Sequence, residues 1–362
     1  MELFIRDYWP HGLAKRTVVT VVTTKHKNVG RTRVAIAVAA VLVVPALLNM
    51  LTNEVLRARH PVPGAFPSSD TFSQHFSGQV AAKFLTVLEA GVTPTELLWY
   101  PTTHTKSGTA RMRAVPGHEF SGVITAIGKE VQDFEVGDEV YGMNDWFADG
   151  AIAEFCITLP QNIARKPATL SHEAAASVPI GALTSWQGLI DRAKLEPGER
   201  VLVHGGAGAV GLYAVQLAHV RGARVITTVS TQDIDFVKRL GADEAIDYKA
   251  CRFEKEVRDV DVVFDAVGGD TLERSWGVLK PGGRMITIAA DSEGTGDQRV
   301  KDAFFIVEPN QKQLVKIAKQ LDAGHLRAFV KTTVPLDEAS AAYSGAVRDK
   351  SGYGKIVIAV PA

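Results

Sequence analysis

The second half of the chain alternates short apolar runs with segments of helical periodicity. Residues 200–204 form an apolar run that Pro197 and Gly198 precede and glycine follows, which is typical of a buried parallel strand. Because strands and helices alternate from there on, the pattern predicts an α/β fold with a doubly wound parallel sheet. Further strands are predicted at residues 224–228, 244–246, 261–265 and 284–289, and helices at residues 234–240, 271–278 and 311–321.

The preceding part of the chain, from about residue 78, is richer in strands. Apolar runs separated by glycines predict a small, mostly β and partly antiparallel domain. Ser171 is a suitable N-cap for a helix, and a second helix is predicted at about residues 182–191. The tail at residues 355–360 has the pattern of a strand, and we expect it to return to this first β domain. The apolar runs lie at residues 82–88, 120–127, 139–141 and 153–158.

Residues 1–77 form an atypical N-terminal extension. Its apolar run at residues 34–51 contains no charged side chain and follows four basic residues. Such a run has about the minimum length of a membrane span, although Pro45 and Asn49 interrupt it. The sequence therefore leaves two alternatives open: a helix that associates with a membrane, or a segment that is buried, docked on the surface or poorly ordered.

The composition is that of a folded globular protein. The 362 residues are 46% hydrophobic and 22% charged, which is enough for two domains. Forty basic and forty acidic side chains cancel, so no basic field favours nucleic acid as a partner. Cys156 and Cys251 are the only cysteines, which excludes a disulfide scaffold and a four-cysteine zinc site and fits a reducing compartment.

A glycine turn follows the predicted strand at residues 200–204. Gly206, Gly208 and Gly211 have the spacing G-x-G-x-x-G, and a helix is predicted directly after them. One glycine of such a motif permits the tight turn, one lets the backbone approach a pyrophosphate, and one lets helix and strand pack closely. The helix N-terminus offers unpaired amides to the phosphates. This strand, turn and helix therefore predict a dinucleotide-binding site.

Several motifs, taken with this turn, resemble the medium-chain dehydrogenase/reductase superfamily over roughly residues 78–362. Within it, residues 91–99 and 305–309 look like the zinc-free quinone oxidoreductase branch. The resemblance implies a GroES-like, mostly β catalytic domain at residues 78–190 and 326–362, and a Rossmann cofactor domain at residues 191–325. The motifs are Pro116-Gly117-His118-Glu119-Phe120-Ser121-Gly122, Gly137-Asp138-Glu139-Val140-Tyr141-Gly142, Leu240-Gly241-Ala242-Asp243, Asp265-Ala266-Val267-Gly268-Gly269 and Leu279-Lys280-Pro281-Gly282-Gly283.

Zinc-dependent members of this superfamily hold a catalytic metal with cysteine and histidine. His118 and Glu119 stand in the matching Gly-His-Glu motif, but residues 92–94 and 181–182, where the resemblance places the other ligands, contain no cysteine. A His-Glu pair alone does not supply the three protein ligands that a catalytic zinc normally has. We therefore expect no metal, and we expect His118 in a structural role.

The chemistry that the resemblance implies is hydride transfer from a nicotinamide cofactor to a quinone or an activated alkene, such as an enone or enal. Without a metal, the developing oxyanion or enolate needs hydrogen-bond donors and a proton from a hydroxyl or water. The candidate catalytic residues are Thr93, Tyr100 and Thr184, the last of which faces the nicotinamide in the family. Tyr141 is a further candidate, and packing is the alternative role for both tyrosines.

The second strand of the cofactor domain favours NADPH over NADH. Val229 stands where NAD-binding members place the acid that holds the ribose hydroxyls. Ser230, Tyr248 and Lys249 are candidates for binding the 2′-phosphate, although Asp233 and Asp235 lie close enough in sequence for either to reach a ribose. The cofactor-binding residues expected from the turn and the resemblance are Gly206, Gly208, Ala209, Val210, Gly211, Ser230, Tyr248, Lys249, Val267, Ile288, Ala289, Phe305, Val307 and Lys355.

Two other functions stay open. One is an enoyl reductase of a biosynthetic pathway, and the other is a non-catalytic NADPH-binding protein of the crystallin type. The resemblance further implies a homodimer that forms through the cofactor domain. We expect a small electrophilic acceptor as the partner, and a cytoplasmic location with membrane contact only through residues 34–51.

Overall fold

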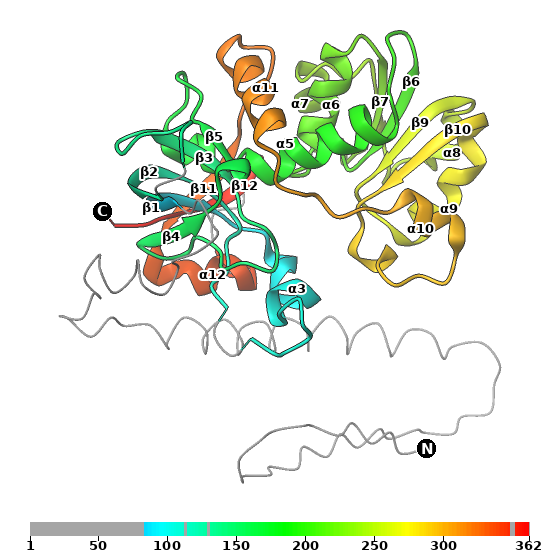
Figure 1. Ribbon diagram of the computed structural model, residues 1–362. Helices are drawn as coiled ribbons and strands as arrows, with labels where there is room; N and C mark the ends of the chain where they lie inside the picture. The colour runs from blue at the N-terminus through cyan, green and yellow to red at the C-terminus, as the bar shows by residue number, and fades with distance from the viewer. Residues whose placement is uncertain (1–82, 112–113, 129–130, 348–351, 362) are drawn as a thin grey trace, which may run out of the picture. The chain divides into compact units, whose positions relative to one another are not determined.

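The computed structural model describes residues 83–111, 114–128, 131–347 and 352–361, and Figure 1 shows their helices and strands. The predicted extension at residues 1–77, with its apolar run at residues 34–51, lies outside the described residues. Within the described ranges, no helix is long and apolar enough to cross a bilayer.

A seven-stranded, mainly antiparallel sheet takes its strands from both ends of the described chain. Its strands are β1 (Lys83–Gly91), β2 (Glu119–Ile127), β3 (Glu139–Met143), β4 (Phe155–Thr158), β5 (Ile163–Arg165), β11 (Val330–Pro335) and β12 (Lys355–Ala359). Their order is β11-β12-β1-β2-β3-β5, with β4 also paired to β1. The predicted return of the tail is confirmed, because β12 pairs antiparallel with β1 and sets Ile358 opposite Ala90.

A five-stranded sheet follows, and all its pairs are parallel, as predicted. Its strands are β6 (Arg200–His204), β7 (Arg224–Val229), β8 (Glu244–Asp247), β9 (Val260–Asp265) and β10 (Leu279–Thr287), in the order β10-β9-β6-β7-β8. Successive side chains of a strand point to opposite faces. Val201 and Val203 accordingly belong to one apolar cluster and Leu202 to another, so the continuous apolar run reflects burial of both faces.

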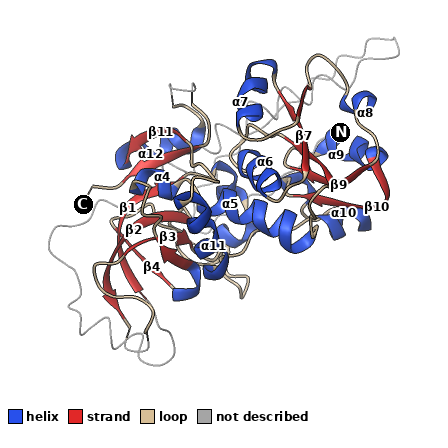
Figure 2. Ribbon diagram, turned by 90° about the horizontal axis from the view of Figure 1, so that it is seen from above, coloured by secondary structure: helices blue, strands red, loops and turns tan. Residues whose placement is uncertain are grey.

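Helices cover both faces of the parallel sheet (Figure 2). The predicted cap at Ser171 is confirmed, since its hydroxyl accepts from the amide of Ala174 at 3.2 Å. The helix expected at residues 182–191 begins earlier, at Pro179, and ends in a π-helical turn, η3 (Gln187–Arg192). The α-helices are α3 (Tyr100–Thr103), α4 (His172–Ala176), α5 (Pro179–Trp186), α6 (Gly211–Val220), α7 (Ile234–Arg239), α8 (Phe253–Glu256), α9 (Gly269–Ser275), α10 (Gln298–Ala303), α11 (Gln311–Asp322) and α12 (Ala339–Ser344).

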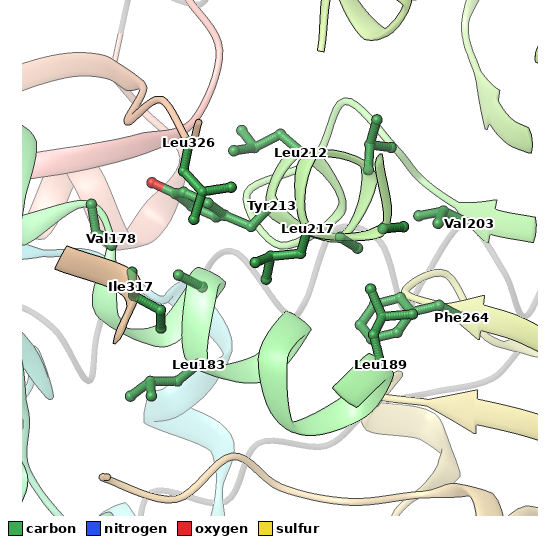
Figure 3. Close-up of a cluster of buried hydrophobic side chains, with 14 of the residues drawn as sticks. Val178, Leu183, Leu189, Val203, Leu212, Tyr213, Leu217, Phe264, Ile317 and Leu326 are labelled. Atoms are coloured by element: carbon green, nitrogen blue, oxygen red, sulfur yellow. The ribbon is translucent and has the colours of Figure 1, made fainter. Parts of the chain in front are cut away.

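The largest apolar cluster packs α5, α6 and α11 against β6 and β9 (Figure 3). Leu183, Leu189, Leu212 and Phe264 are fully buried in it, and full burial of one such side chain contributes about 1.5–3 kcal/mol. The same cluster includes Tyr141 of β3. The core therefore fixes the position of α5 relative to strands of both sheets. Residues of α5 also belong to the candidate active site described below.

His204 is a fully buried histidine at the carboxyl end of β6. Its Nδ1 lies 2.9 Å from Thr228 Oγ1 and its Nε2 lies 2.9 Å from Ser275 Oγ. Burial, with a smaller contribution from the positive charge of Arg274, lowers the pKa of His204 to about 3. The folded protein therefore excludes a proton that the unfolded chain binds below about pH 6.5.

We expect this exclusion to destabilise the fold in acid. His204 should cost about 1.4 kcal/mol of unfolding free energy for each unit by which the pH falls from 6.5 toward 3. Urea unfolding at pH 7.5, 6.0 and 4.5 should give a flatter pH dependence for His204→Asn than for the wild type. Glu89, whose pKa burial raises to about 7, titrates in both proteins and cancels in the difference. Parallel curves would contradict this account.

Candidate active site

The glycine turn joins β6 to α6 as predicted. Gly205 adopts φ +75°, and the amide of Gly208 donates to the carbonyl of Gly205 at 2.9 Å. A Cβ on Gly211 would lie 2.1 Å from that carbonyl oxygen, and a Cβ on Gly206 would lie 2.0 Å from Thr227 Oγ1. These two glycines therefore permit the close packing of turn, strand and helix.

A pocket of about 450 Å³ lies beside this turn, at the carboxyl edge of the parallel strands. This is the edge at which open α/β sheets bind dinucleotides, next to the unpaired amides of a helix N-terminus. The pocket size and the bare glycine backbone fit a nicotinamide dinucleotide. The residues predicted to bind cofactor that line it are Gly208, Ala209, Val210, Gly211, Ser230, Tyr248 and Ile288.

Four of the predicted cofactor-binding residues line neither this pocket nor the second pocket described below. Gly206 packs against β7, and Ala289 is buried beside the pocket region. Val267 is exposed and lies near the turn, since a Cβ on Gly205 would sit 3.3 Å from it. Lys249 is exposed, with its Nζ 5.9 Å from the ring centroid of Tyr248.

The polar end of the first pocket contains a carboxylate. The Ser230 hydroxyl donates to Asp233 Oδ2 at 2.5 Å, and the Tyr353 hydroxyl donates to Asp233 Oδ1 at 3.2 Å. The Tyr353 ring also stacks on Phe236, with the ring centroids 3.5 Å apart. Because the hydroxyl hydrogen of Ser230 is committed to Asp233, a ribose phosphate there would have to compete for it.

A second pocket, of about 210 Å³, adjoins the first, because Ala209, Val210 and Ile288 line both. Apolar side chains form most of its wall, among them Val92 and Trp99. Besides these three shared residues, five further predicted site residues line it: Thr93, Thr184, Phe305, Val307 and Lys355. The structure thus brings two of the three candidate catalytic residues to one cavity beside the glycine turn.

Lys355 and Glu119 form a buried ion pair at the edge of the second pocket. Lys355 is 5% exposed, and its ammonium contacts the Glu119 carboxylate and donates to Thr93 Oγ1 at 2.9 Å. The second oxygen of Glu119 accepts from the amide of Ile180, in the first turn of α5, at 2.9 Å. Gly91 makes room for this carboxylate, since a Cβ there would lie 2.5 Å from Glu119 Cγ.

The other candidate hydroxyls differ in what they contact. Thr184 lines the pocket, but its hydroxyl donates to the carbonyl of Ile180 one turn earlier, at 2.6 Å. Tyr100 lies outside the pocket lining, is 51% exposed and stacks on His104. Tyr141 is fully buried, and its hydroxyl donates to the carbonyl of Leu314 at 2.7 Å, so it packs in the core.

His118 belongs to a buried hydrogen-bond network. Its Nδ1 lies 2.5 Å from Glu96 Oε2, and its Nε2 faces the carbonyl of Ala148 at 3.3 Å. The other oxygen of Glu96 accepts from the amide of Gly117 at 2.9 Å and from the Tyr343 hydroxyl. Burial and the adjacent carboxylate raise the pKa of Tyr343 well above its usual range, which keeps this hydroxyl a donor.

The donor set here does not fit a catalytic zinc. Both ring nitrogens of His118 face oxygen atoms, and the Lys355 ammonium occupies the cation position beside Glu119. In the part of the chain that the structure describes, no group of three or more His, Cys, Asp or Glu side chains is arranged to hold a metal ion.

Three of these contacts were not predicted from the sequence. Glu96 and Tyr343 are 247 residues apart and meet only through folding. Asp233 was named as a side chain that could reach a ribose, but its contact with Ser230 was not predicted. The motifs around Glu119 and Lys355 were both recognised, but no local signal indicated that the two side chains pair.

Comparisons with known proteins identify relatives of both parts of the described chain. An alcohol dehydrogenase GroES-like domain matches residues 77–168, and a zinc-binding dehydrogenase domain matches residues 240–358. A probable zinc-binding oxidoreductase, mitochondrial, from Arthroderma benhamiae is 34% identical over 73% of this chain and 84% of its own length.

Two further relatives are also named as oxidoreductases. An NADPH-dependent alkenal/one oxidoreductase, chloroplastic, from Arabidopsis thaliana is 32% identical over 70% of this chain and 66% of its own. The quinone oxidoreductase from Coxiella burnetii is 28% identical and superimposes with a TM-score of 0.70, over 78% of this chain and 91% of its own. The chain therefore belongs to the medium-chain dehydrogenase/reductase superfamily, in its quinone oxidoreductase-like branch, and is an oxidoreductase that uses a nicotinamide cofactor.

Proposed function

We propose that the protein is an NADPH-dependent reductase of enones, enals or quinones that works without zinc. The observation that carries the proposal is the pair of adjoining pockets. The first fits a dinucleotide beside the glycine turn, and the second is an apolar cavity with Thr93 and Lys355 at its edge. The names of the Arabidopsis and Coxiella relatives support the same acceptor classes.

Some pocket residues form the apolar walls of the cavity, and others stabilise the negative charge that develops on the acceptor. Bound at the glycine turn, a reduced nicotinamide supplies a hydride equivalent. Phe305 and Val307 provide apolar walls that exclude water from the second pocket, which strengthens electrostatic interactions inside it. The Thr93 hydroxyl is placed to donate a hydrogen bond to the negative charge that develops on the acceptor oxygen.

The test is a turnover assay on the full-length protein. NADPH and NADH oxidation is followed with an enone, a quinone and an enoyl thioester, with and without EDTA. We expect oxidation of NADPH with the enone or the quinone, unchanged by the chelator. Turnover restricted to the thioester would instead favour the biosynthetic enoyl reductase. Tight NADPH binding without turnover of any acceptor would favour a non-catalytic protein.

The preference for NADPH rests on the neutral Val229 at the end of β7 and on Lys249 near Tyr248. Lys249→Ala should weaken NADPH binding roughly fivefold, by about 1 kcal/mol, because an exposed ammonium contributes modestly to holding a phosphate. NADH, which lacks the 2′-phosphate, should bind within twofold of the wild type.

Fluorescence titration of both cofactors measures this prediction. Lys255→Ala is the matched control, because Lys255 is an exposed lysine on α8 that does not line the first pocket. Equal losses of NADPH and NADH affinity, or no loss of either, would contradict a role for Lys249 at the phosphate.

The same proposal covers the domain limits and the assembly. We place the catalytic domain at residues 78–190 and 326–362 and the cofactor domain at residues 191–325, and we propose a homodimer through the cofactor domain. Light scattering of the purified chain should give twice the mass of one chain. A monomer would remove the dimer from the proposal and leave the active site unaffected.

A further inference from the structure

The geometry points to a proton-delivery chain in which Thr93 donates the proton that completes the reduction and Lys355, held by Glu119, resupplies it. This inference rests on the proposed function, because it assigns the source of the proton that the reduced acceptor takes up. Thr93 would touch the acceptor, whereas Lys355 is a positioning residue that acts through Thr93.

The first observation is that the ammonium is directed at Thr93. Lys355 is almost fully buried, and Glu119 beside it has no exposed surface. One Glu119 oxygen is held by the amide of Ile180, which leaves the other to face Lys355. A buried charge is stable only when it is paired and hydrogen-bonded, so this geometry holds the ammonium with one proton toward Thr93 Oγ1.

The second observation is the difference between Thr93 and Thr184, two of the three threonines that line the second pocket. Thr184 commits its hydroxyl hydrogen to the carbonyl of Ile180. Thr93 accepts from Lys355, and the structure places no described side chain or carbonyl as an acceptor for its own hydrogen. Because Thr93 also lines the pocket, its hydrogen is available to an acceptor bound there. Thr95 lines the pocket too, but Thr93 is the threonine that accepts from the Lys355 ammonium.

Atoms and electrons balance when the reduced nicotinamide of the proposed function supplies the hydride. Hydride addition to the β-carbon of an enone oxidises the nicotinamide and leaves an enolate. The Thr93 O–H bond breaks as its proton passes to the enolate, while a Lys355 N–H bond breaks as its proton passes to the Thr93 oxygen. Lys355 then regains a proton from water. The acceptor gains one hydride and one proton, and the threonine and lysine return to their starting states.

The experiment compares acceptors whose reduced anions differ in basicity. Thr93→Val should lower kcat roughly 100-fold on an enone, because a positioned general acid contributes about 10²–10⁴-fold. On a chlorinated benzoquinone, whose reduced anion is a much weaker base, the loss should stay below about fivefold, since catalysis by a general acid follows the basicity of its target. Thr93→Ser keeps the hydroxyl and should recover kcat to within about threefold of the wild type.

The test of Lys355 changes Glu119 as well, so that no unpaired carboxylate is left buried. The double variant K355M/E119Q removes both members of the ion pair, and it should lose roughly 10- to 100-fold in kcat on the enone and little on the chlorinated quinone. Thr158→Val is the matched control, because Thr158 is a buried threonine of β4 that does not line the second pocket. Fluorescence titration of NADPH, which needs no turnover, should give all variants a Kd within about threefold of the wild type.

The outcomes separate the two proposals. If the wild type reduces neither acceptor, the proposed function fails. If the wild type reduces both but Thr93→Val and K355M/E119Q match it, or lose equally on both acceptors, the proton chain is wrong and the reductase stands. An NADPH Kd that weakens in parallel with kcat would also overturn the chain, because Thr93 and Lys355 would then only bind the cofactor.

Discussion

Replacing His118 by alanine is expected to lower the free energy of unfolding by about 3–5 kcal/mol, because removing one member of a buried pair leaves the other uncompensated. Glu96 is fully buried and would lose the 2.5 Å contact to the imidazole. The substitution also opens a hole beside Trp146, whose ring centroid lies 4.8 Å from that of His118. Urea unfolding measures the loss, and thermal melting should show a Tm lower by roughly 10 °C.

Two comparisons show whether the network explains the effect. Glu96→Gln combined with His118→Ala should be less destabilised than the sum of the two single changes, because the neutral amide removes the unpaired charge. His325→Ala, at an exposed histidine, should change stability by less than about 0.5 kcal/mol. EDTA should leave the wild-type Tm unchanged, whereas a fall in Tm on chelation that is absent in His118→Ala would show that His118 ligates a metal.

Replacing Gly211 by alanine is expected to weaken NADPH binding roughly 100-fold, by about 2.7 kcal/mol. The new Cβ would lie 2.1 Å from the carbonyl oxygen of Gly205, so the turn must move away from the position that accepts the pyrophosphate. Forcing an extra methyl into this packing should also cost about 1–3 kcal/mol of stability. Fluorescence titration and urea unfolding measure the two effects separately.

Gly277→Ala is the matched control for this substitution. Gly277 lies in the short helix η5 (Trp276–Val278), is exposed, and has no atom within 4 Å of a Cβ built on it. We expect NADPH affinity within twofold of the wild type and a stability change of less than about 0.5 kcal/mol. Wild-type NADPH affinity in Gly211→Ala would show that the turn does not hold the cofactor.

The fold was predictable where local patterns are strong. The parallel strands could be placed because burial on both faces makes them continuous apolar runs, and the turn because its glycines have a fixed spacing. Two strands were missed for the opposite reason. β5 has only three residues, and β11 is a partly buried strand whose centre is Lys331, Thr332 and Thr333, so neither shows an apolar pattern.

The candidate site was predictable only in part. Thr93, Thr184 and Lys355 were identified from motifs and line one cavity. Tyr100 was named on the same basis, but it is an exposed residue outside that lining. A motif indicates which residue types stand near a site, whereas the direction of a side chain depends on packing against elements that are distant in sequence.

The order of the amino acids was enough to predict the glycine turn, the parallel sheet and the absence of cysteine ligands, because each depends on residue types within a short stretch of chain. Which charged side chains meet depends instead on how distant segments fold together. Lys355 reaches Glu119 because β12 pairs with β1 and β1 pairs with β2, and Tyr343 reaches Glu96 across most of the described chain. Buried polar groups must find partners wherever the fold offers them. The pairing that distinguishes a donor hydroxyl at Thr93 from an occupied one at Thr184 is therefore a property of the assembled fold.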